Sequence, residues 1–327
     1  MKRRRAALSA LISAFALAAG LAPAQPASPF PARAVTLIVP YAAGGLPDTV
    51  ARVVGQKLAE KWGQPVVVDN RPGGNGVVAA QALAARPADG HTLLVTDGSL
   101  YAINPFVYKD LPYDALKDFT FVSLTARAPL FLAVHPSLPA RTFAEFVQLA
   151  KSRPGTLSYG SSGIGSQHHL TAESMKASLG LDLLHVPFKG TSQSVPAVVS
   201  GQVSAVFSAY PSLAGFAREG KLRLLAVNAG KRSALAPDVP TVAESGVPGF
   251  DFAPTIGVAG PAGMPAGVAA KIAADIAEAL RDPAMAERLQ VLGIDPVGGG
   301  PEAYAAQVME DRARYEKAVR VARARPE

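Results

Sequence analysis

Two glycine- and serine-rich segments carry residues suited to binding an anion. Residues 40–49 (PYAAGGLPDT) follow an apolar run, residues 159–169 (YGSSGIGSQHH) begin in a predicted strand, and each segment leads into a helical pattern. A helix N-terminus offers unpaired N–H donors and the positive end of the helix dipole. The bare backbone at Gly44 and Gly45 suits close approach of a ligand. We therefore predict that the two loops grip one carboxylate from opposite sides, although glycine and serine also serve simply to turn and cap chains.

Other chemistries find less support in the sequence. The chain has no Cys, which excludes disulfides, thiolate metal sites and a cysteine nucleophile. Its five histidines form no HExxH or similar ligand pattern, so no metal site is expected. The segment from Gly160 to Ile164 lacks the last glycine of a GxSxG nucleophile elbow. The lysine after Gly230 is followed by Arg232, and position 225 is Leu, which excludes a Walker A loop.

Residues 74–79 (GNGVVA) have the outline of a dinucleotide-binding fingerprint. They follow an apolar run, open a helical pattern and precede Asp97 by about 20 residues. However, residues 69–73 separate that run from the first glycine, where the fingerprint requires a tight turn. We therefore interpret these glycines as shaping an ordinary loop, and expect no cofactor.

Short strand-like runs and amphipathic helices alternate along the chain. The runs lie at 35–39, 66–68, 92–96, 131–134, 183–187, 203–207 and 222–227. This alternation predicts an α/β fold with mainly parallel sheets. The C-terminal third differs, because residues 265–281 and 301–323 are helical in pattern and only 252–259 resembles a strand.

The first 24 residues read as a secretory signal peptide. MKRRR precedes an Ala- and Leu-rich run, and Ala22-Pro23-Ala24 is a small-x-small cleavage site. Cleavage near Ala24 lowers the formal charge of the 327-residue chain from +7 to +3. No dense cluster of Lys and Arg residues remains, so the sequence gives no indication of nucleic-acid binding. We expect an exported, periplasmic protein.

Two segments are candidates for crossings between domains, at 124–132 and 247–256. They predict a discontinuous first lobe formed by residues 25–129 plus 253–327, and a second lobe formed by 130–252. A domain inserted through two strand-like crossings produces a hinge with a cleft between the lobes.

Seven motifs occur in order between about residues 31 and 315. They are PYAAGGLPDTVAR, QPVVVDNRPGGNG, DGHTLLV, AINPFVYKDLPYDALKDF, YGSSGIGSQHHL, HVPFKGTS and RSALAPDVPTVAESGVPGF. This set resembles the Bug family of periplasmic receptors for tripartite tricarboxylate transporters. The resemblance implies a two-lobed periplasmic binding protein of type II, a "Venus flytrap" in which each lobe is a sheet flanked by helices. It also implies a monomeric receptor without catalysis, which binds a small carboxylate in the interlobe cleft and delivers it to a two-subunit inner-membrane permease.

The resemblance also suggests which residues contact the ligand. His169 matches the family's His-Leu pair at a helix start, and Lys189 matches its Lys-Gly pair. For His169 we favour a role in bracing the loop over contact with the ligand. For Lys189 we favour either a bracing role or exposure to solvent over contact with the ligand. The candidate ligand-binding residues are Tyr41, Ala43, Gly44, Gly45, Asp48, Asp97, Ser161, Ser162, Gly163, Ile164, Gly165, Ser166, His169, Ser208 and Tyr210.

Departures from the family pattern bear on the ligand. Family members commonly have Phe-Asp-Asn where this chain has Phe207-Ser208-Ala209-Tyr210. They usually have Ser or Asn at the position of Asp97. With Ile164 in a commonly polar position, we expect a carboxylate with an apolar or aromatic body and a donor facing Asp97. A periplasmic input module for a signalling partner is an alternative function. An exported hydrolase is a remoter one.

Overall fold

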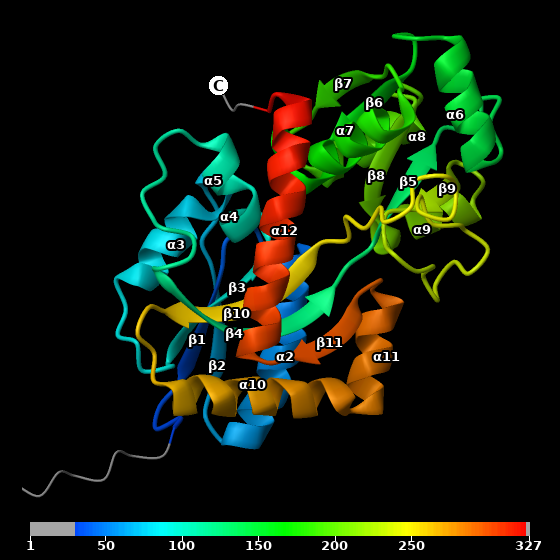
Figure 1. The fold of residues 1–327 in the computed structure, drawn as a ribbon. Helices are drawn as coiled ribbons and strands as arrows, with labels where there is room; N and C mark the ends of the chain where they lie inside the picture. The colour runs from blue at the N-terminus through cyan, green and yellow to red at the C-terminus, as the bar shows by residue number, and fades with distance from the viewer. Residues whose placement is uncertain (1–29, 325–327) are drawn as a thin grey trace, which may run out of the picture.

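The computed structural model describes residues 30–324, so the expected signal peptide lies outside the described residues. The chain forms two lobes, each a β-sheet with helices around it (Figure 1). The predicted two-lobed α/β class is confirmed. No helix among residues 30–324 has both the length and the apolarity needed to cross a bilayer.

The first sheet has six strands in the order β11-β4-β10-β3-β1-β2. Its strands are β1 (Val35–Val39), β2 (Val66–Asn70), β3 (Thr92–Asp97), β4 (Phe119–Arg127), β10 (Thr255–Pro261) and β11 (Asp295–Gly299). The associated helices are α2 (Leu46–Trp62), the 3-10 turn η2 (Gly74–Gly76), α3 (Val77–Ala84), α4 (Ser99–Ala102), α5 (Asn104–Val107), α10 (Ala266–Arg281), α11 (Pro283–Val291) and α12 (Pro301–Ala322).

The second sheet has five strands in the order β7-β6-β8-β5-β9. Its strands are β5 (Leu130–Val134), β6 (Ser158–Ser161), β7 (Leu184–Pro187), β8 (Ala205–Ala209) and β9 (Arg223–Val227). The helices of this lobe are α6 (Phe143–Ser152), α7 (Gln167–Leu179), α8 (Thr191–Val199) and α9 (Tyr210–Arg218).

The prediction of mainly parallel sheets is wrong, because both sheets are mixed. β1 pairs in parallel with β2 and β3, but β10 is antiparallel to both β3 and β4. In the second sheet β5 is antiparallel to β8 and β9. Each sheet thus combines a parallel α/β part with one strand next to a passage between the lobes that runs in the opposite direction, β10 in the first sheet and β5 in the second.

Strand β11 is missing from the sequence prediction, and β4 was anticipated only in part, as a crossing. β11 reads DPVGG and contains a single large apolar residue, so it carries no strand pattern of its own. It forms a strand because it pairs with β4 at the edge of the first sheet. Its assignment therefore depends on a partner more than 160 residues away in sequence.

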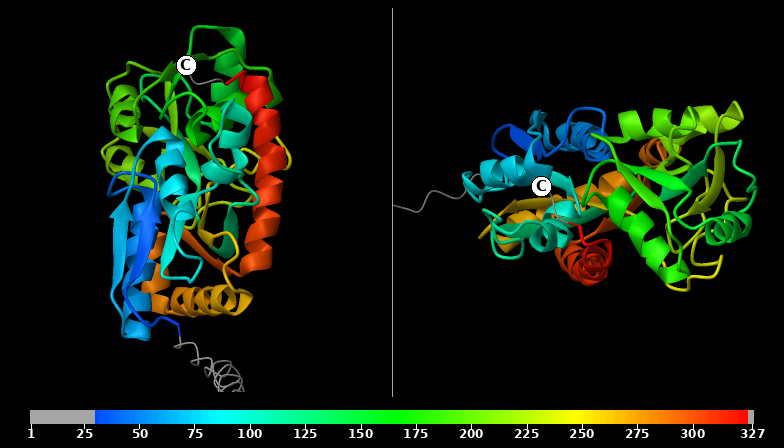
Figure 2. Two further views of the ribbon diagram at one scale, coloured as in Figure 1. Left: turned by 90° about the vertical axis from the view of Figure 1, so that its left-hand side faces the viewer. Right: turned by 90° about the horizontal axis from the view of Figure 1, so that it is seen from above.

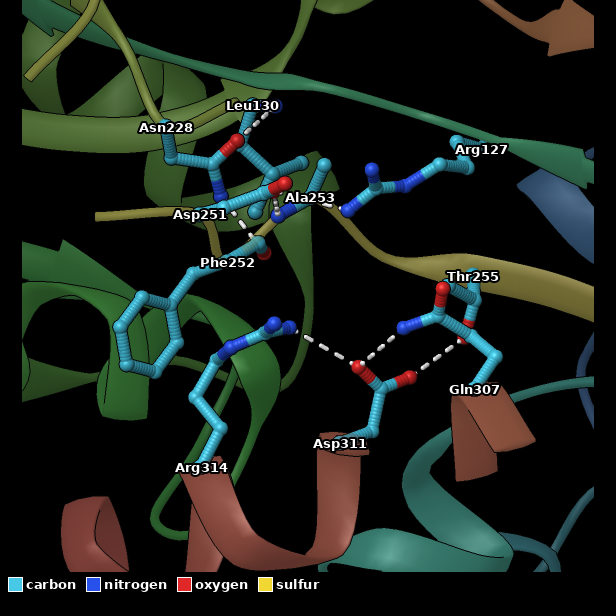
Figure 3. A network of polar contacts seen from close by, with 10 residues as sticks. All are labelled: Arg127, Leu130, Asn228, Asp251, Phe252, Ala253, Thr255, Gln307, Asp311 and Arg314. Atoms are coloured by element: carbon cyan, nitrogen blue, oxygen red, sulfur yellow. Dashed lines mark hydrogen bonds and ion pairs between the residues drawn. The ribbon is translucent and has the colours of Figure 1, made fainter. Parts of the chain in front are cut away.

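The passages between the lobes are held by a polar network (Figure 3). Nη2 of Arg127 lies 2.8 Å from Oδ1 of Asp251, which joins the end of β4 to the segment before β10. The buried Asn228 side chain accepts a hydrogen bond from the Leu130 amide and donates one to the Phe252 carbonyl, each 2.8 Å long. These contacts tie the outgoing and returning chains to each other.

Helix α12 lies along both lobes (Figures 1 and 2). Tyr304 and Val308, in its first half, pack in a core with residues of β1 and β3. Tyr315 and Ala318, in its second half, join the core of the second sheet. Gly257 of β10 permits the close approach, because a Cβ there would overlap the Tyr304 ring. The predicted boundary, which gives all of residues 253–327 to the first lobe, leaves out this second set of contacts.

Candidate functional site

A cavity of about 560 Å³ lies between the two lobes, and we call it the interlobe cavity. Both predicted loops line it, so they face each other across the cleft. The first loop contributes residues 41–47, and the second contributes Ser162 and Ser166. The volume is within the range of clefts that hold small organic ligands.

Four helix N-termini meet at this cavity. α2 contributes Leu46 and Pro47, α7 contributes Gln167, α8 begins at Thr191, and α9 contributes Ser212. Three of the four, those of α2, α8 and α9, have no side-chain cap on their first-turn amides. Each N-terminus carries about half a positive charge. Their convergence therefore favours a negatively charged group.

The cavity wall formed by the described residues contains no Lys or Arg. Besides the phenol of Tyr41, its ionisable side chains are Asp97 and His168. Residues 30–324 also contain no cluster of three or more His, Asp or Glu side chains placed to hold a metal ion. Any anion in this cavity would therefore meet helix ends, amides and hydroxyls.

Asp97 is held by two donors on its own lobe. The Tyr41 hydroxyl and the Ser99 amide each donate to Oδ1 of Asp97 at 2.9 Å. Burial raises the pKa of Asp97 above its ordinary value. Burial, together with the adjacent carboxylate, also raises the pKa of Tyr41, so its phenol stays protonated and remains a donor. The aspartate thus presents a fixed acceptor to the cavity, as expected for a ligand that carries a donor.

His168 is the histidine at the cavity wall. Its Nδ1 lies 2.7 Å from Oγ of Ser162, which joins the second loop to the first turn of α7. Burial lowers the pKa of His168 to about 4, so the ring is neutral at physiological pH. It contributes hydrogen-bonding capacity without a positive charge.

The glycine amides of the two loops are used within the loops themselves. The Gly44 amide donates to Oδ2 of Asp48 at 2.8 Å, and the Gly163 amide to Oγ of Ser161 at 3.1 Å. The Gly165 amide donates to Nδ1 of His169 at 3.1 Å. The Gly44 amide is therefore already bonded within its own loop, although Gly44 lies on the cavity wall. These bonds instead hold the loops in shape, so that the helix ends face the cavity.

A stack of rings supports the second loop from behind. The His169 and His185 rings lie 4.0 Å apart, and His185 lies 4.9 Å from the Tyr159 ring. Nε2 of His185 is 2.7 Å from Oγ of Ser161, and burial lowers the pKa of His185 to about 4. His169 thus packs beneath the loop. Lys189 is exposed, and its backbone amide donates to Oε1 of Gln193 at 3.2 Å.

The fifteen predicted residues divide into three groups by position. Those on the wall of the interlobe cavity are Tyr41, Ala43, Gly44, Gly45, Asp97, Ser162, Ser166 and Ser208. Ile164 and Gly165 line a neighbouring pocket of about 320 Å³. The residues that line neither are Asp48, Ser161, Gly163, His169 and Tyr210. Asp48 is buried in an ion pair with Arg52, and Tyr210 packs on the Phe131 ring.

Several residues of the cavity wall lie outside the set predicted from the sequence. Gln167 is only 6% exposed, and its Nε2 has no hydrogen-bond partner among the described residues. Gln167 follows Ser166 directly, so the predicted start of a helix at this position could have identified it as a wall residue. The apolar part of the wall gave no such signal, because it comes from distant segments: Leu130, Pro211, Pro254, Ile256, Leu292 and Ile294.

A cavity between two lobes, with helix N-termini and hydroxyl groups on its wall, is typical of a solute-binding protein. A model of the family described as "Tripartite tricarboxylate transporter family receptor" matches residues 50–323. The chain belongs to this family of receptors. The resemblance inferred from the seven motifs is thereby confirmed.

Individual relatives agree with this assignment. Protein BugT of Bordetella pertussis is 34% identical over 96% of this chain and 96% of its own length. A solved structure titled "R. palustris Rpa4515 with adipate" is 35% identical, with a TM-score of 0.82, and covers 91% of this chain and 100% of that one. "MatC (Rpa3494) from Rhodopseudomonas palustris with bound malate" is 33% identical, with a TM-score of 0.76, over 89% of this chain and 100% of that one.

Proposed function

We propose that this protein is a periplasmic receptor that binds a small carboxylate in the interlobe cavity and passes it to a two-subunit inner-membrane permease. The observation that carries the proposal is the convergence of four helix N-termini on a cavity whose described wall has no Lys or Arg. The related structures named for adipate and malate support a carboxylate as the ligand class. The receptor acts as a monomer and performs no catalysis.

Hydrogen bonds alone account for useful affinity. Micromolar binding requires about 8 kcal/mol, and a hydrogen bond to a charged group contributes about 1.5 to 3 kcal/mol before association costs. The donors available include Gln167 Nε2 and the buried Ser208 Oγ, neither of which has a partner among the described residues. Together with first-turn amides they are numerous enough for a carboxylate.

The ligand carries an apolar or aromatic body and a hydrogen-bond donor. Leu130, Ile256 and Ile294 form part of an apolar surface on the cavity wall. The Asp97 carboxylate, fixed by Tyr41, supplies the acceptor for the donor. It also disfavours a second carboxylate close by, since like charges repel in a partly buried site.

Calorimetric titration of the mature protein tests the ligand class. Citrate, succinate, glutamate, nicotinate and benzoate span one to three carboxylates with polar or aromatic bodies. We expect benzoate or nicotinate to bind more tightly than citrate. Tight binding of citrate or glutamate with no response to the aromatic acids would contradict the proposed ligand. Mass spectrometry of small molecules retained after native purification would identify the natural one.

Delivery requires a separate experiment. Membrane vesicles that contain the permease should take up the labelled ligand only when the loaded receptor is added. Uptake that proceeds equally without the receptor would contradict delivery while leaving ligand binding intact. Size-exclusion chromatography with light scattering tests the monomer, and fractionation of the producing cells tests the periplasmic location.

A further inference from the structure

The second pocket, of about 320 Å³, adjoins the interlobe cavity, and we call it the outer pocket. Tyr41, Ala42, Asn75, Ser162 and Ser166 line both spaces. These shared residues form a neck between the two. The cavities are therefore parts of one continuous trough between the lobes.

The neck is held in place by hydrogen bonds within the protein. Nδ2 of Asn75 donates to Oδ1 of Asn104 at 2.6 Å, and Nδ2 of Asn104 donates back to the Asn75 carbonyl at 3.0 Å. On the opposite lobe Ser162 is bonded to His168, as described above. Both sides of the opening are thus fixed by contacts that need no ligand.

The outer pocket is uncharged, and part of its wall is apolar. Pro40, Pro72, Val107 and Ile164 line it together with the ring of Tyr108. Its described wall contains no Asp, Glu, Lys, Arg or His. Burial raises the pKa of Tyr108, so its hydroxyl is neutral. A charged group would find no ion-pair partner here, whereas an uncharged chain would find apolar surface beside the polar groups of Asn75 and Ser162.

The two lobes approach each other closely beside this pocket. A Cβ at Gly165 of the second lobe would lie 3.2 Å from Cγ1 of Val107 of the first. Ile164, which stands between Gly163 and Gly165, is 42% exposed at the pocket. Its exposed apolar surface is available to cover a ligand.

We propose that the outer pocket is a second subsite for the same ligand and receives an uncharged, mainly apolar tail. This inference rests on the proposed function, which places the carboxylate in the interlobe cavity. The ligand is then an elongated monocarboxylate whose chain passes through the neck between Tyr41 and Ser162. A dicarboxylate of equal length is disfavoured, because its second charge would lie in a pocket whose described wall offers no ion-pair partner.

A chain-length series measures the subsite. Butanoate, hexanoate, octanoate and decanoate are titrated into the mature protein by calorimetry. Each added methylene that enters the outer pocket should tighten binding about fourfold, which corresponds to about 0.8 kcal/mol. Octanedioate should bind at least tenfold more weakly than octanoate. Affinity that does not rise with length, or tighter binding of octanedioate, would overturn the subsite.

The Ile164→Ser substitution tests whether the effect of chain length on affinity arises in the outer pocket. It should weaken octanoate binding about fivefold and change butanoate binding less than twofold, because only the longer chain reaches the pocket. Leu184→Ser is the matched control, since Leu184 is 55% exposed in the same lobe and lines neither cavity. Equal losses for both acids in Ile164→Ser, or an equal effect of Leu184→Ser, would contradict the proposal.

A neutral probe separates this inference from the proposed function. Methyl-labelled protein is titrated with 1-hexanol, and the NMR signals of Ile164, Val107 and Leu184 are followed. The subsite predicts shifts at Ile164 and Val107 and none at Leu184. If no acid binds but these shifts occur, the outer subsite stands and the carboxylate receptor fails. If butanoate binds but hexanol produces no shifts and length has no effect, the receptor stands and the subsite is overturned.

Discussion

The hinge and the interlobe cavity differ in how their buried polar groups are bonded. At the hinge the charged groups are paired within the protein: Asp311 accepts from Thr255 at 2.9 Å and from Arg314 at 2.9 Å, and Arg127 pairs with Asp251, although Nε of Arg127 has no partner among the described residues (Figure 3). At the cavity, Gln167 Nε2 and Ser208 Oγ have no partner among the described residues. The hinge network therefore serves the fold, whereas the cavity leaves donors for a ligand.

This difference predicts different consequences for mutations. Removing one member of a buried hydrogen-bonded pair leaves its partner unsatisfied and lowers the free energy of unfolding. Removing a donor that has no partner in the ligand-free protein leaves that free energy unchanged or higher. The same substitution should then weaken ligand binding.

The largest effect is expected at the hinge. Asp311→Ala removes the acceptor of Thr255, Gln307 and Arg314 and should lower the free energy of unfolding by about 3 kcal/mol. Urea unfolding followed by circular dichroism measures it. Glu310→Ala, at the exposed neighbouring position of α12, is the control. A loss below about 1 kcal/mol would show that the network is not structural.

In the cavity, Gln167→Ala should weaken carboxylate binding by about tenfold to a hundredfold, the contribution of one hydrogen bond to a charged group. Unfolding free energy should stay constant or rise, because Nε2 has no partner without the ligand. Calorimetry and urea unfolding measure the two quantities. The exposed Gln202→Ala variant is the control. Destabilisation together with normal affinity would assign Gln167 to the fold.

Asp97→Asn tests the negative charge on the cavity wall. The amide keeps an oxygen for the Tyr41 and Ser99 donors but removes the charge. Dicarboxylates should bind about tenfold more tightly, because repulsion is relieved. Ligands that donate to Asp97 should bind more weakly. Asp238→Asn, at an exposed position, should change neither affinity. Unchanged dicarboxylate binding in Asp97→Asn would show that the ligand does not approach this side chain.

The smallest effect concerns the protonation of His168. In the free protein its pKa is lowered to about 4 by burial, and a bound carboxylate should raise it by stabilising the imidazolium. Affinity for an anion that stays ionised then rises as pH falls through the ligand-bound pKa, and levels off below about 4.

NMR titration of the ring protons measures this shift directly. His185 is an internal control, because its pKa is also lowered to about 4 but it lies off the cavity wall. Equal shifts at both rings, or none at His168, would contradict a ligand beside His168.

Much of the fold could be predicted from local patterns. The apolar runs at Val35–Val39 and Thr92–Asp97 are strands, and α2 and α7 begin at the predicted loops, with Ser166 accepting from the His169 amide at the start of α7. These features depend on a few adjacent residues. The direction of strand pairing depends on the path of the whole chain, and here the prediction failed.

The candidate site was predictable only in part, for the same reason. His168 rather than His169 reaches the cavity, because the turn of α7 places His169 beneath the loop. Leu292 and Ile294 reach the wall from the segment before β11, far along the chain from either loop. No local pattern marks such residues.

The order of the amino acids by itself determined the α/β receptor pattern and the two loops at which helices start, because glycine, serine and apolar spacing act over a few residues. Only the tertiary structure decided which amides are used inside those loops, which donors remain for a ligand and how far the trough extends. The amide bonds depend on the folded path of each loop, and the other two outcomes depend on segments far apart in the sequence that meet at the cavity, which no local sequence rule fixes.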